Sequence, residues 1–148
     1  MFTYLIDDDP ISLFLTEQML RLGGFQAPIL SFTEAAVALT YLLPRLATAL
    51  PQVILLDVNM PRMNGWQFLD ALTPYSSVLQ GRCQLYLLTS SLALADTARA
   101  RSYALISGII HKPLDAEQVR TILAQRNDFS GHPLSGPAPA AEDGTSPE

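Results

Sequence analysis

The stretch Val53-Ile54-Leu55-Leu56-Asp57 is an unbroken apolar run that ends in a single acid. Such a run predicts a short strand covered on both faces, as strands of parallel sheets are when helices lie on either side. Shorter or weaker apolar runs predict four more strands, at residues 2–6, 27–31, 85–88 and 105–110. The run over 53–57 is therefore the third of five predicted strands.

Helix-periodic stretches separate the predicted strands. They cover residues 11–22, 33–43, 66–72, 93–103 and 115–126. Pro10 suits a first helical turn, Thr33 is expected to cap the second helix, and Pro44 is expected to end or kink it. Asp115 followed by Gln118 resembles a capping box. This alternation predicts an α/β fold, a doubly wound five-stranded parallel sheet flanked by five helices, whose strand order the pattern leaves open.

The composition is that of a soluble, globular chain. Hydrophobic residues make up 49% of the 148 residues and charged residues 16%. With nine Lys and Arg, no run of them and a formal net charge of −5, the chain is not expected to bind nucleic acid directly. The amino terminus lacks a secretory signal and no apolar run is long enough to cross a bilayer, so we expect a cytoplasmic protein.

The chain is expected to form one domain followed by a tail. Residues 1–126 are enough for a single domain with a real core. Residues 127–148, rich in Pro, Ala, Gly, Ser and acids towards the end, are predicted to be a disordered tail. Cys83, the only cysteine, lies in an apolar stretch and is predicted to be buried, while Trp66 and Phe68 are expected to pack.

Polar residues follow four of the predicted strands. They are Asp7-Asp8-Asp9 after the first strand, Asp57 after the third, Thr89-Ser90 after the fourth and Lys112 after the fifth. In an open parallel sheet, ligands bind beyond the carboxyl ends of the strands. Because those ends share one rim, acids far apart in the sequence can converge on one site.

The types of these residues suit phosphoryl chemistry. Crowded carboxylates repel one another, which raises the pKa of some of them or demands a cation, and a hard divalent ion such as Mg²⁺ takes oxygen ligands. Lys112 and Thr89 offer a dianionic phosphoryl group a point charge and a hydroxyl donor. A carboxylate nucleophile, a metal, a lysine and a hydroxyl together favour phosphoryl transfer to an aspartate.

Each residue also has a structural interpretation. Asp57 alone could be a turn residue, Lys112 a solvated surface charge and Thr89 a helix cap. The three consecutive aspartates could favour the dipole of the following helix, and at least one of them is expected to do so. The combination is more specific than its members, because every member falls at the same edge of the predicted sheet.

Four motifs resemble the response-regulator receiver domain family, as found in CheY-like single-domain proteins. They are Leu5–Pro10, Ile54–Pro61 with Asn64-Gly65, Leu87–Ser90 and Lys112-Pro113. The motifs stand in the family's order and approximate spacing, and the resemblance extends over about the first 126 residues. It implies the flavodoxin-like fold of receiver domains.

The resemblance implies a magnesium site. Asp8 would bind Mg²⁺ directly and Asp7 mainly through water. Asp57 would also be a ligand, and Asn59 would contribute its backbone carbonyl.

The resemblance also implies how a phosphoryl group is held. Asp57 would be the phosphoacceptor, Thr89 would hydrogen-bond the phosphoryl group, and Lys112 would pair with it. Pro113 corresponds to a cis-proline position that aims the lysine inward.

One position departs from the family pattern. The family usually carries an aromatic residue three places before the lysine, which moves inward when the threonine shifts, and here that position is Ile109. The nearest upstream aromatic residue, Tyr103, falls in the predicted helix over 93–103. We therefore expect phosphorylation to cause a smaller rearrangement, or one that uses different residues.

The function implied is two-component signal transduction. A sensor histidine kinase or histidine phosphotransfer protein would donate the phosphoryl group to Asp57. A stand-alone receiver, monomeric or dimerising on phosphorylation, would then bind a downstream protein through the helix over 93–103, the strand over 105–110 and the last helix. We expect no enzyme activity beyond the chain's own phosphorylation and dephosphorylation.

Three alternatives remain at this point. The chain could be a phosphorelay intermediate that passes its phosphoryl group to a second histidine protein. It could be a degenerate receiver that acts as a docking module. A metal-dependent phosphohydrolase of the haloacid-dehalogenase type would need a second acid two residues after the nucleophile, and Asp57-Val58-Asn59 lacks it.

Overall fold

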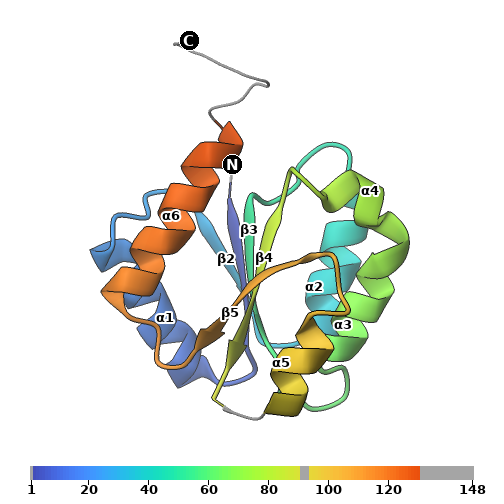
Figure 1. Ribbon diagram of the computed structural model, residues 1–148, viewed down its shortest axis with the longest axis horizontal. Coiled ribbons are helices and arrows are strands. Elements are labelled where there is room, and N and C mark those ends of the chain that lie inside the picture. Colours follow the sequence, from blue (N-terminus) through green and yellow to red (C-terminus); the bar gives the residue numbers. More distant parts are fainter. Residues whose placement is uncertain (1, 91–93, 131–148) are drawn as a thin grey trace.

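Five parallel strands form the central sheet of the computed structural model, which describes residues 2–90 and 94–130 (Figure 1). The strands are β1 (Thr3–Ile6), β2 (Ile29–Phe32), β3 (Val53–Asp57), β4 (Gln84–Thr89) and β5 (Ile106–His111). Their order in the sheet is β2-β1-β3-β4-β5. The chain reverses its direction of winding between β1 and β3, so the carboxyl ends of these two strands flank the point where doubly wound sheets bind ligands.

Helices cover both faces of the sheet (Figure 1). They are α1 (Pro10–Leu22), α2 (Ala35–Leu42), α3 (Gly65–Leu72), α4 (Ser76–Leu79), α5 (Leu94–Ala100) and α6 (Ala116–Ser130). Helices α1 and α6 pack on one face, and α2, α3 and α5 on the other. The predicted doubly wound α/β fold is confirmed. In the part of the chain that the structure describes, no helix is both long and apolar enough to cross a membrane.

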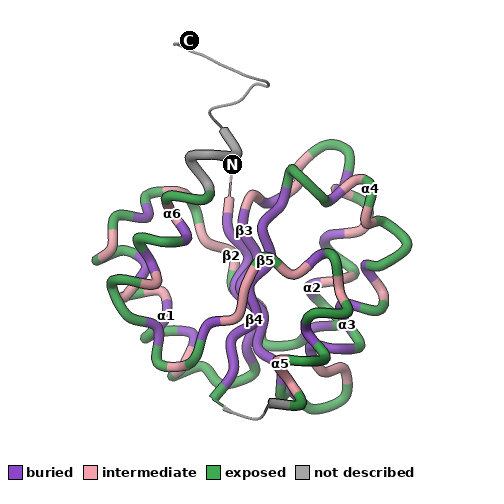
Figure 2. Tube along the Cα trace, viewed as in Figure 1, coloured by how far each residue is buried: buried purple, intermediate pink, exposed green. Residues whose placement is uncertain are grey.

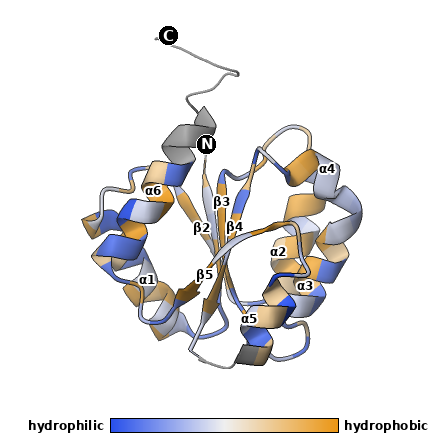
Figure 3. Cartoon of the chain, viewed as in Figure 1, coloured by the Kyte–Doolittle hydropathy of each residue, from blue (hydrophilic) through white to orange (hydrophobic). Residues whose placement is uncertain are grey.

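The inner strands β1, β3 and β4 are buried along their whole length (Figure 2). Most of their residues are hydrophobic, as Figure 3 shows. In β3, Ile54 and Leu56 pack with the α2–α3 layer, whereas Val53 and Leu55 pack with α1 and α6. Complete burial of one such side chain stabilises the fold by about 1.5–3 kcal/mol. The apolar run that predicts the fold therefore also joins the two helical layers.

The apolar periodicity of α1 runs along its outer face. Four large apolar side chains of this helix are exposed: Ile11 (69%), Phe14 (62%), Leu15 (60%) and Leu22 (81%). Leu13, Thr16 and Leu20 are the buried residues that attach the helix to the sheet. Helix α1 therefore has an inner apolar face that supports the core and an outer one that meets solvent.

The start of α2 corrects one prediction. Thr33 does not cap this helix, because β2 runs on to Phe32 and the N-cap position falls on Glu34, whose side chain makes no capping bond. Pro44 lies in the 3-10 turn η1 (Leu43–Arg45), which directly follows α2, so this proline does end the helix as predicted.

Helix α5 is shorter than predicted and ends at Ala100. The backbone N–H groups of Ser102 and Tyr103 donate to the carbonyls of Arg99 and Ala100, both at 3.1 Å. Bonds across three residues are those of a 3-10 turn, which closes the helix. Tyr103 is therefore outside the helix in which the sequence pattern placed it.

The last helix confirms its predicted start and extends past its predicted end. Asp115 and Gln118 form the capping box, with backbone-to-side-chain bonds of 2.8 and 3.0 Å. Helix α6 continues beyond Arg126 to Ser130, and the rest of the predicted tail, residues 131–148, lies outside the described residues. The 3-10 turn η2 (Thr73–Tyr75) and the short α4 between α3 and β4 were not predicted.

Candidate functional site

Four strand ends bring their polar residues to one rim of the sheet, as the sequence predicts. Asp7 follows β1, Asp57 ends β3, Thr89 ends β4 and Lys112 follows β5. The Lys112 Nζ atom lies 2.8 Å from Oδ2 of Asp7 and 3.2 Å from Oδ1 of Asp57. The backbone N–H of Lys112 donates to the carbonyl of Thr89 at 2.8 Å, which ties the end of β5 to the end of β4.

Asp7 is buried and held by three donors. Its Oδ2 atom accepts from the Ser12 hydroxyl at 2.6 Å and from Lys112, and its Oδ1 atom accepts from the backbone N–H of Asp9 at 3.0 Å. Ser12 lies in the first turn of α1, and sequence reasoning missed it. Only its position just after the three acids signals its role, because apolar periodicity does not show which way a serine side chain points.

Asp57 is buried at the rim, with 6% of its surface exposed. Burial, the largest cause, and the negative charge of Asp7 raise the pKa of its carboxyl, Lys112 opposes both effects, and the resulting pKa is about 6. Burial lowers the pKa of the Lys112 ammonium, but its hydrogen bond to Asp7 and the charge of Asp57 outweigh that effect and raise it overall. One ammonium thus leaves the negative charge of the rim partly uncompensated.

The donor set at this rim fits a hard divalent cation. Asp7, Asp8 and Asp57 each offer a carboxylate oxygen, and the three atoms lie within 4.8 Å of one another. Asp8 is exposed, which leaves room for the water ligands that Mg²⁺ retains. Asp9 is not part of this group, because its Oδ1 atom accepts from the backbone N–H of Ile11 at 3.0 Å and caps α1. It is therefore the aspartate that serves the helix start.

The loop after Asp57 leaves no space for a side chain at Gly65. A Cβ atom there would lie 2.7 Å from the carbonyl oxygen of Asp57 and 3.0 Å from the Cα of Val58. The N–H of Gly65 donates to the Val58 carbonyl at 2.9 Å, and Asn64 with Gln67 forms a capping box at the same helix start. The first turn of α3 is therefore in direct contact with the backbone of Asp57.

The remaining predicted site residues have defined positions. Thr89 is buried, with 3% of its surface exposed, and Asn59 is exposed two residues after Asp57. The Lys112–Pro113 peptide bond is cis, as expected. Ile109 is half-buried on β5.

A groove of about 610 Å³ runs from the rim along α1. Ser12 and Lys112, which both contact Asp7, line one end of it together with Pro113. The exposed apolar side chains of Leu15 and Leu22 line the groove further along the helix. Exposed apolar patches of this kind mark binding surfaces.

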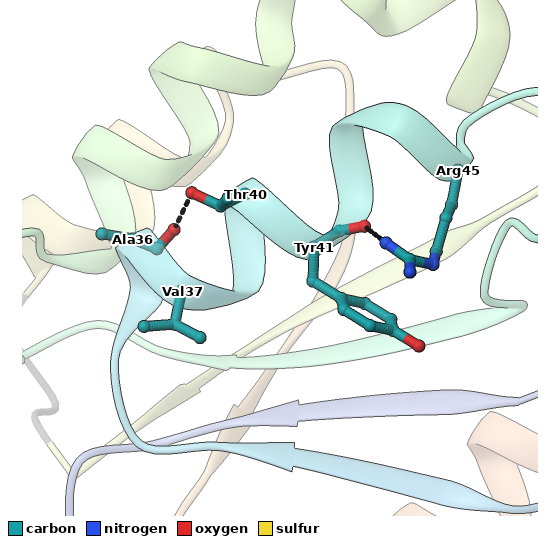
Figure 4. Close-up of a pocket in the computed structure, with 5 residues that line it drawn as sticks. All are labelled: Ala36, Val37, Thr40, Tyr41 and Arg45. Carbon is teal, nitrogen blue, oxygen red and sulfur yellow. Dashed lines mark hydrogen bonds between the residues drawn. The ribbon is translucent and has the colours of Figure 1, made fainter.

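A second hollow, of about 480 Å³, lies on the outer face of α2, and its lining includes Val37 (Figure 4). Its polar side chains are bonded within their own helical segment: the Thr40 hydroxyl donates to the Ala36 carbonyl, and the Arg45 guanidinium to the Tyr41 carbonyl. The guanidinium also lies 3.6 Å from the centre of the Tyr41 ring. None of the rim residues lines this hollow, so we assign it no function.

Three further predictions are confirmed. Cys83 is buried, and burial raises the pKa of its thiol to about 12, so it is not a reactive thiol. Trp66 and Phe68 pack in the core, with 5% and 0% of their surfaces exposed.

Comparison with known proteins agrees with the fold. The chain matches the family model described as the response regulator receiver domain over residues 4–124. A two-component response regulator from Cytophaga hutchinsonii is 29% identical, with a TM-score of 0.79 over 86% of this chain and 96% of that one. A response regulator receiver protein from Dyadobacter fermentans DSM 18053 is 26% identical, with a TM-score of 0.74 over 85% and 97%.

A two-component response regulator from Legionella pneumophila is 25% identical, with a TM-score of 0.73 over 86% of this chain and 98% of that one. No curated protein sequence matches the chain. Since the family model covers most of the chain, and the acids, threonine and lysine of the rim stand at the ends of the expected strands, the chain belongs to the response regulator receiver domain family.

Proposed function

We propose that this receiver domain accepts a phosphoryl group on Asp57 from a histidine-bearing partner and signals by binding other proteins. The observation that carries the proposal is the Lys112 ammonium, which lies within 3.2 Å of both buried carboxylates, Asp7 and Asp57. A pKa of about 6 leaves most of Asp57 ionised near neutral pH, so its carboxylate can act as the nucleophile.

In the proposed transfer, an oxygen of Asp57 attacks phosphorus, the bond from phosphorus to the donor's imidazole nitrogen breaks, and an acyl phosphate forms. Lys112, already beside that oxygen, pairs with the added negative charge. Thr89 at the adjacent strand end supplies a hydroxyl donor. When bound at Asp7, Asp8 and Asp57, with Asn59 adding its backbone carbonyl, Mg²⁺ supplies charge neutralisation at the transferring group.

The outer face of α1 has the pattern of a surface that packs against a helix of the phosphodonor protein. Ile11, Leu15, Gln18 and Leu22 follow alternating spacings of four and three residues, which is the seam that packs against another helix. The apolar members of this seam are 60% or more exposed. The groove beside them leads to Lys112 at the rim. A partner helix seated on α1 would therefore reach the Asp57 rim.

Intact mass after incubation with acetyl phosphate and Mg²⁺ tests the proposal. We expect one added phosphoryl group on the wild-type chain and none on Asp57→Asn or without Mg²⁺. Asp9→Asn is a matched control, because asparagine caps a helix as well as aspartate does. An adduct on Asp57→Asn, or no adduct and no beryllofluoride binding on the folded wild-type chain, would contradict the proposal and favour a docking module.

The alternative role as a phosphorelay intermediate rests on the same site. Incubating the phosphorylated chain with a purified histidine phosphotransfer domain distinguishes the two roles. Return of the phosphoryl group to that domain indicates a relay, and its retention on Asp57 indicates a terminal regulator. In either case we expect no turnover of a general phosphatase substrate.

A further inference from the structure

Four side chains join α5 to α3 on the face of the sheet opposite α1. Trp66 and Asp70 come from α3, Arg99 comes from α5, and Tyr103 follows α5. The Tyr103 hydroxyl donates to Oδ1 of Asp70 at 2.6 Å, and its ring stacks on Trp66 with centroids 5.8 Å apart and an interplanar angle of 26°. The Arg99 guanidinium carbon lies 4.7 Å from the centre of the Trp66 ring. We call this set the α3–α5 latch.

The latch is one residue away from the backbone that contacts Asp57. Trp66 directly follows Gly65, whose N–H bonds to Val58 and whose Cα has no space for a Cβ beside the Asp57 carbonyl. Trp66 is 5% exposed, so its position is fixed by packing. A displacement of the Asp57 loop therefore reaches Trp66 through contacts between closely packed atoms.

The other half of the latch belongs to the segment that follows Thr89. Helix α5 is the next described element after β4, and Arg99 and Tyr103 lie at its carboxyl end and just beyond it. Because the chain is continuous from Thr89 to α5, a movement of Thr89 toward a phosphoryl group on Asp57 would be transmitted to α5. Contacts at Arg99 and Tyr103 hold the far end of α5 to α3 and oppose that movement.

We propose that the α3–α5 latch holds α5 in its resting position, and that phosphorylation of Asp57 releases it. The proposal rests on the function proposed for Asp57. The family usually has an aromatic side chain at the position of Ile109. The proposal gives a role in switching to the four latch residues instead of to that position. The latch stabilises only the resting arrangement, so weakening it must favour the state that a bound phosphoryl analogue also favours.

The test is a beryllofluoride titration in Mg²⁺ of the full chain and of Tyr103→Phe, which keeps the stacking on Trp66 and removes the bond to Asp70. Trp66 is the only tryptophan, so its fluorescence reports on the latch directly. We expect Tyr103→Phe to bind beryllofluoride about fivefold more tightly, the equivalent of one hydrogen bond. Tyr75→Phe, a change on η2 outside the latch, should bind as the wild type does.

A second measurement uses the protein without Mg²⁺ or beryllofluoride. Amide hydrogen exchange over residues 94–103 should be faster in Tyr103→Phe than in the wild type, while exchange in β3 stays unchanged. Asp70→Ala should have the same effect, and the double variant should add little to either single change, because both remove the bond between Tyr103 and Asp70.

Unchanged or weaker beryllofluoride binding by Tyr103→Phe, with a wild type that binds it, would overturn the latch and leave the phosphoacceptor function intact. Fully additive effects of the two changes would also overturn it. If the wild type itself fails to bind beryllofluoride, the function proposed for Asp57 fails first, and the latch as a phosphorylation switch fails with it.

Discussion

The two ends of the sheet both bury polar side chains, but among the described residues only those at the carboxyl end are charged. At that end Asp7 and Asp57 lie beside Lys112. At the amino end Thr3 and Gln84 are buried and neutral, and Thr3 Oγ1 and Gln84 Oε1 have no hydrogen-bond partner among the described residues. The free energy of the carboxyl end therefore depends strongly on bound protons and ions. The free energy of the amino end does not.

The difference shows what makes the rim a functional site. An unpaired neutral group costs a roughly constant free energy, whereas crowded carboxylates change their free energy with every added proton, cation or phosphoryl group. Three carboxylates face a single ammonium at the rim. The carboxyl end can therefore respond to added protons, cations and phosphoryl groups.

The largest expected effect is that of removing the rim ammonium. Lys112→Met keeps the aliphatic stem but leaves Asp7 and Asp57 facing each other without a cation. We expect the rate of phosphorylation by acetyl phosphate to fall about 100-fold, as when a preorganised charge is removed from a reaction centre. Mass spectrometry over time measures this rate.

Arg82→Ala is the matched change at the other end of the sheet, since Arg82 is exposed just before β4. It should leave the rate within about twofold of the wild type. Equal losses in the two variants would show that net charge, rather than the position of Lys112, governs the reaction.

The second prediction compares the loss of stability when each of two glycines, Gly65 near the rim and Gly81 before β4, is replaced by alanine. Gly65→Ala places a Cβ 2.7 Å from the Asp57 carbonyl oxygen, whereas a Cβ at Gly81 meets nothing within 4 Å and is strained only by its φ of +78°. We expect urea unfolding to show a loss of about 3 kcal/mol for Gly65→Ala and about 1 kcal/mol for Gly81→Ala. A smaller loss at Gly65 would mean that α3 can shift away from the Asp57 loop.

Much of this rim could be predicted from the sequence, because strand ends follow from apolar runs and parallel strands end at one edge. Ser12 and the α3–α5 latch could not, since they depend on which side chains meet after the helices pack. Tyr103 is the clearest case, because helix propensity extends the pattern past Ala100 while the actual chain turns off to reach Trp66.

The sequence pattern also could not predict which face of α1 packs against the sheet. The apolar spacing that predicts this helix is satisfied by its outer face, while a threonine, Thr16, lies on the buried one. Periodicity shows that a helix is amphipathic and does not show whether its apolar stripe faces the core or a partner. The 3-10 turn η2 and α4, only a turn each, are too short to show a period at all.

A third prediction concerns pH and the charge of Asp57. Its pKa in the folded protein, about 6, lies above its ordinary value of 3.8, so the ionised form costs free energy that the protonated form does not. Stability from this group is complete below about pH 4 and is lost as the pH rises through 6. Asp57→Asn removes this loss of stability and should be about 3 kcal/mol more stable than the wild type at pH 7.5.

Urea unfolding of both proteins at pH 4 and pH 7.5, without divalent cations, measures this difference. The two proteins should have nearly equal stability at pH 4. The difference in their unfolding free energies should appear between pH 4 and pH 6. A gap of the same size at both pH values would mean that asparagine packs better than aspartate, and that charge is not the cause.

The smallest effect is expected at the amino end. Gln84 is buried at the start of β4; its Nε2 atom donates to the Tyr86 hydroxyl at 3.3 Å, while its Oε1 atom has no partner among the described residues. Gln84→Met loses one long hydrogen bond and also removes an unsatisfied acceptor, so the two contributions nearly cancel. We expect a change in unfolding free energy of less than about 0.5 kcal/mol and an unchanged phosphorylation rate. A loss above about 2 kcal/mol would show that this neutral end depends on its polar network as strongly as the rim depends on its charges.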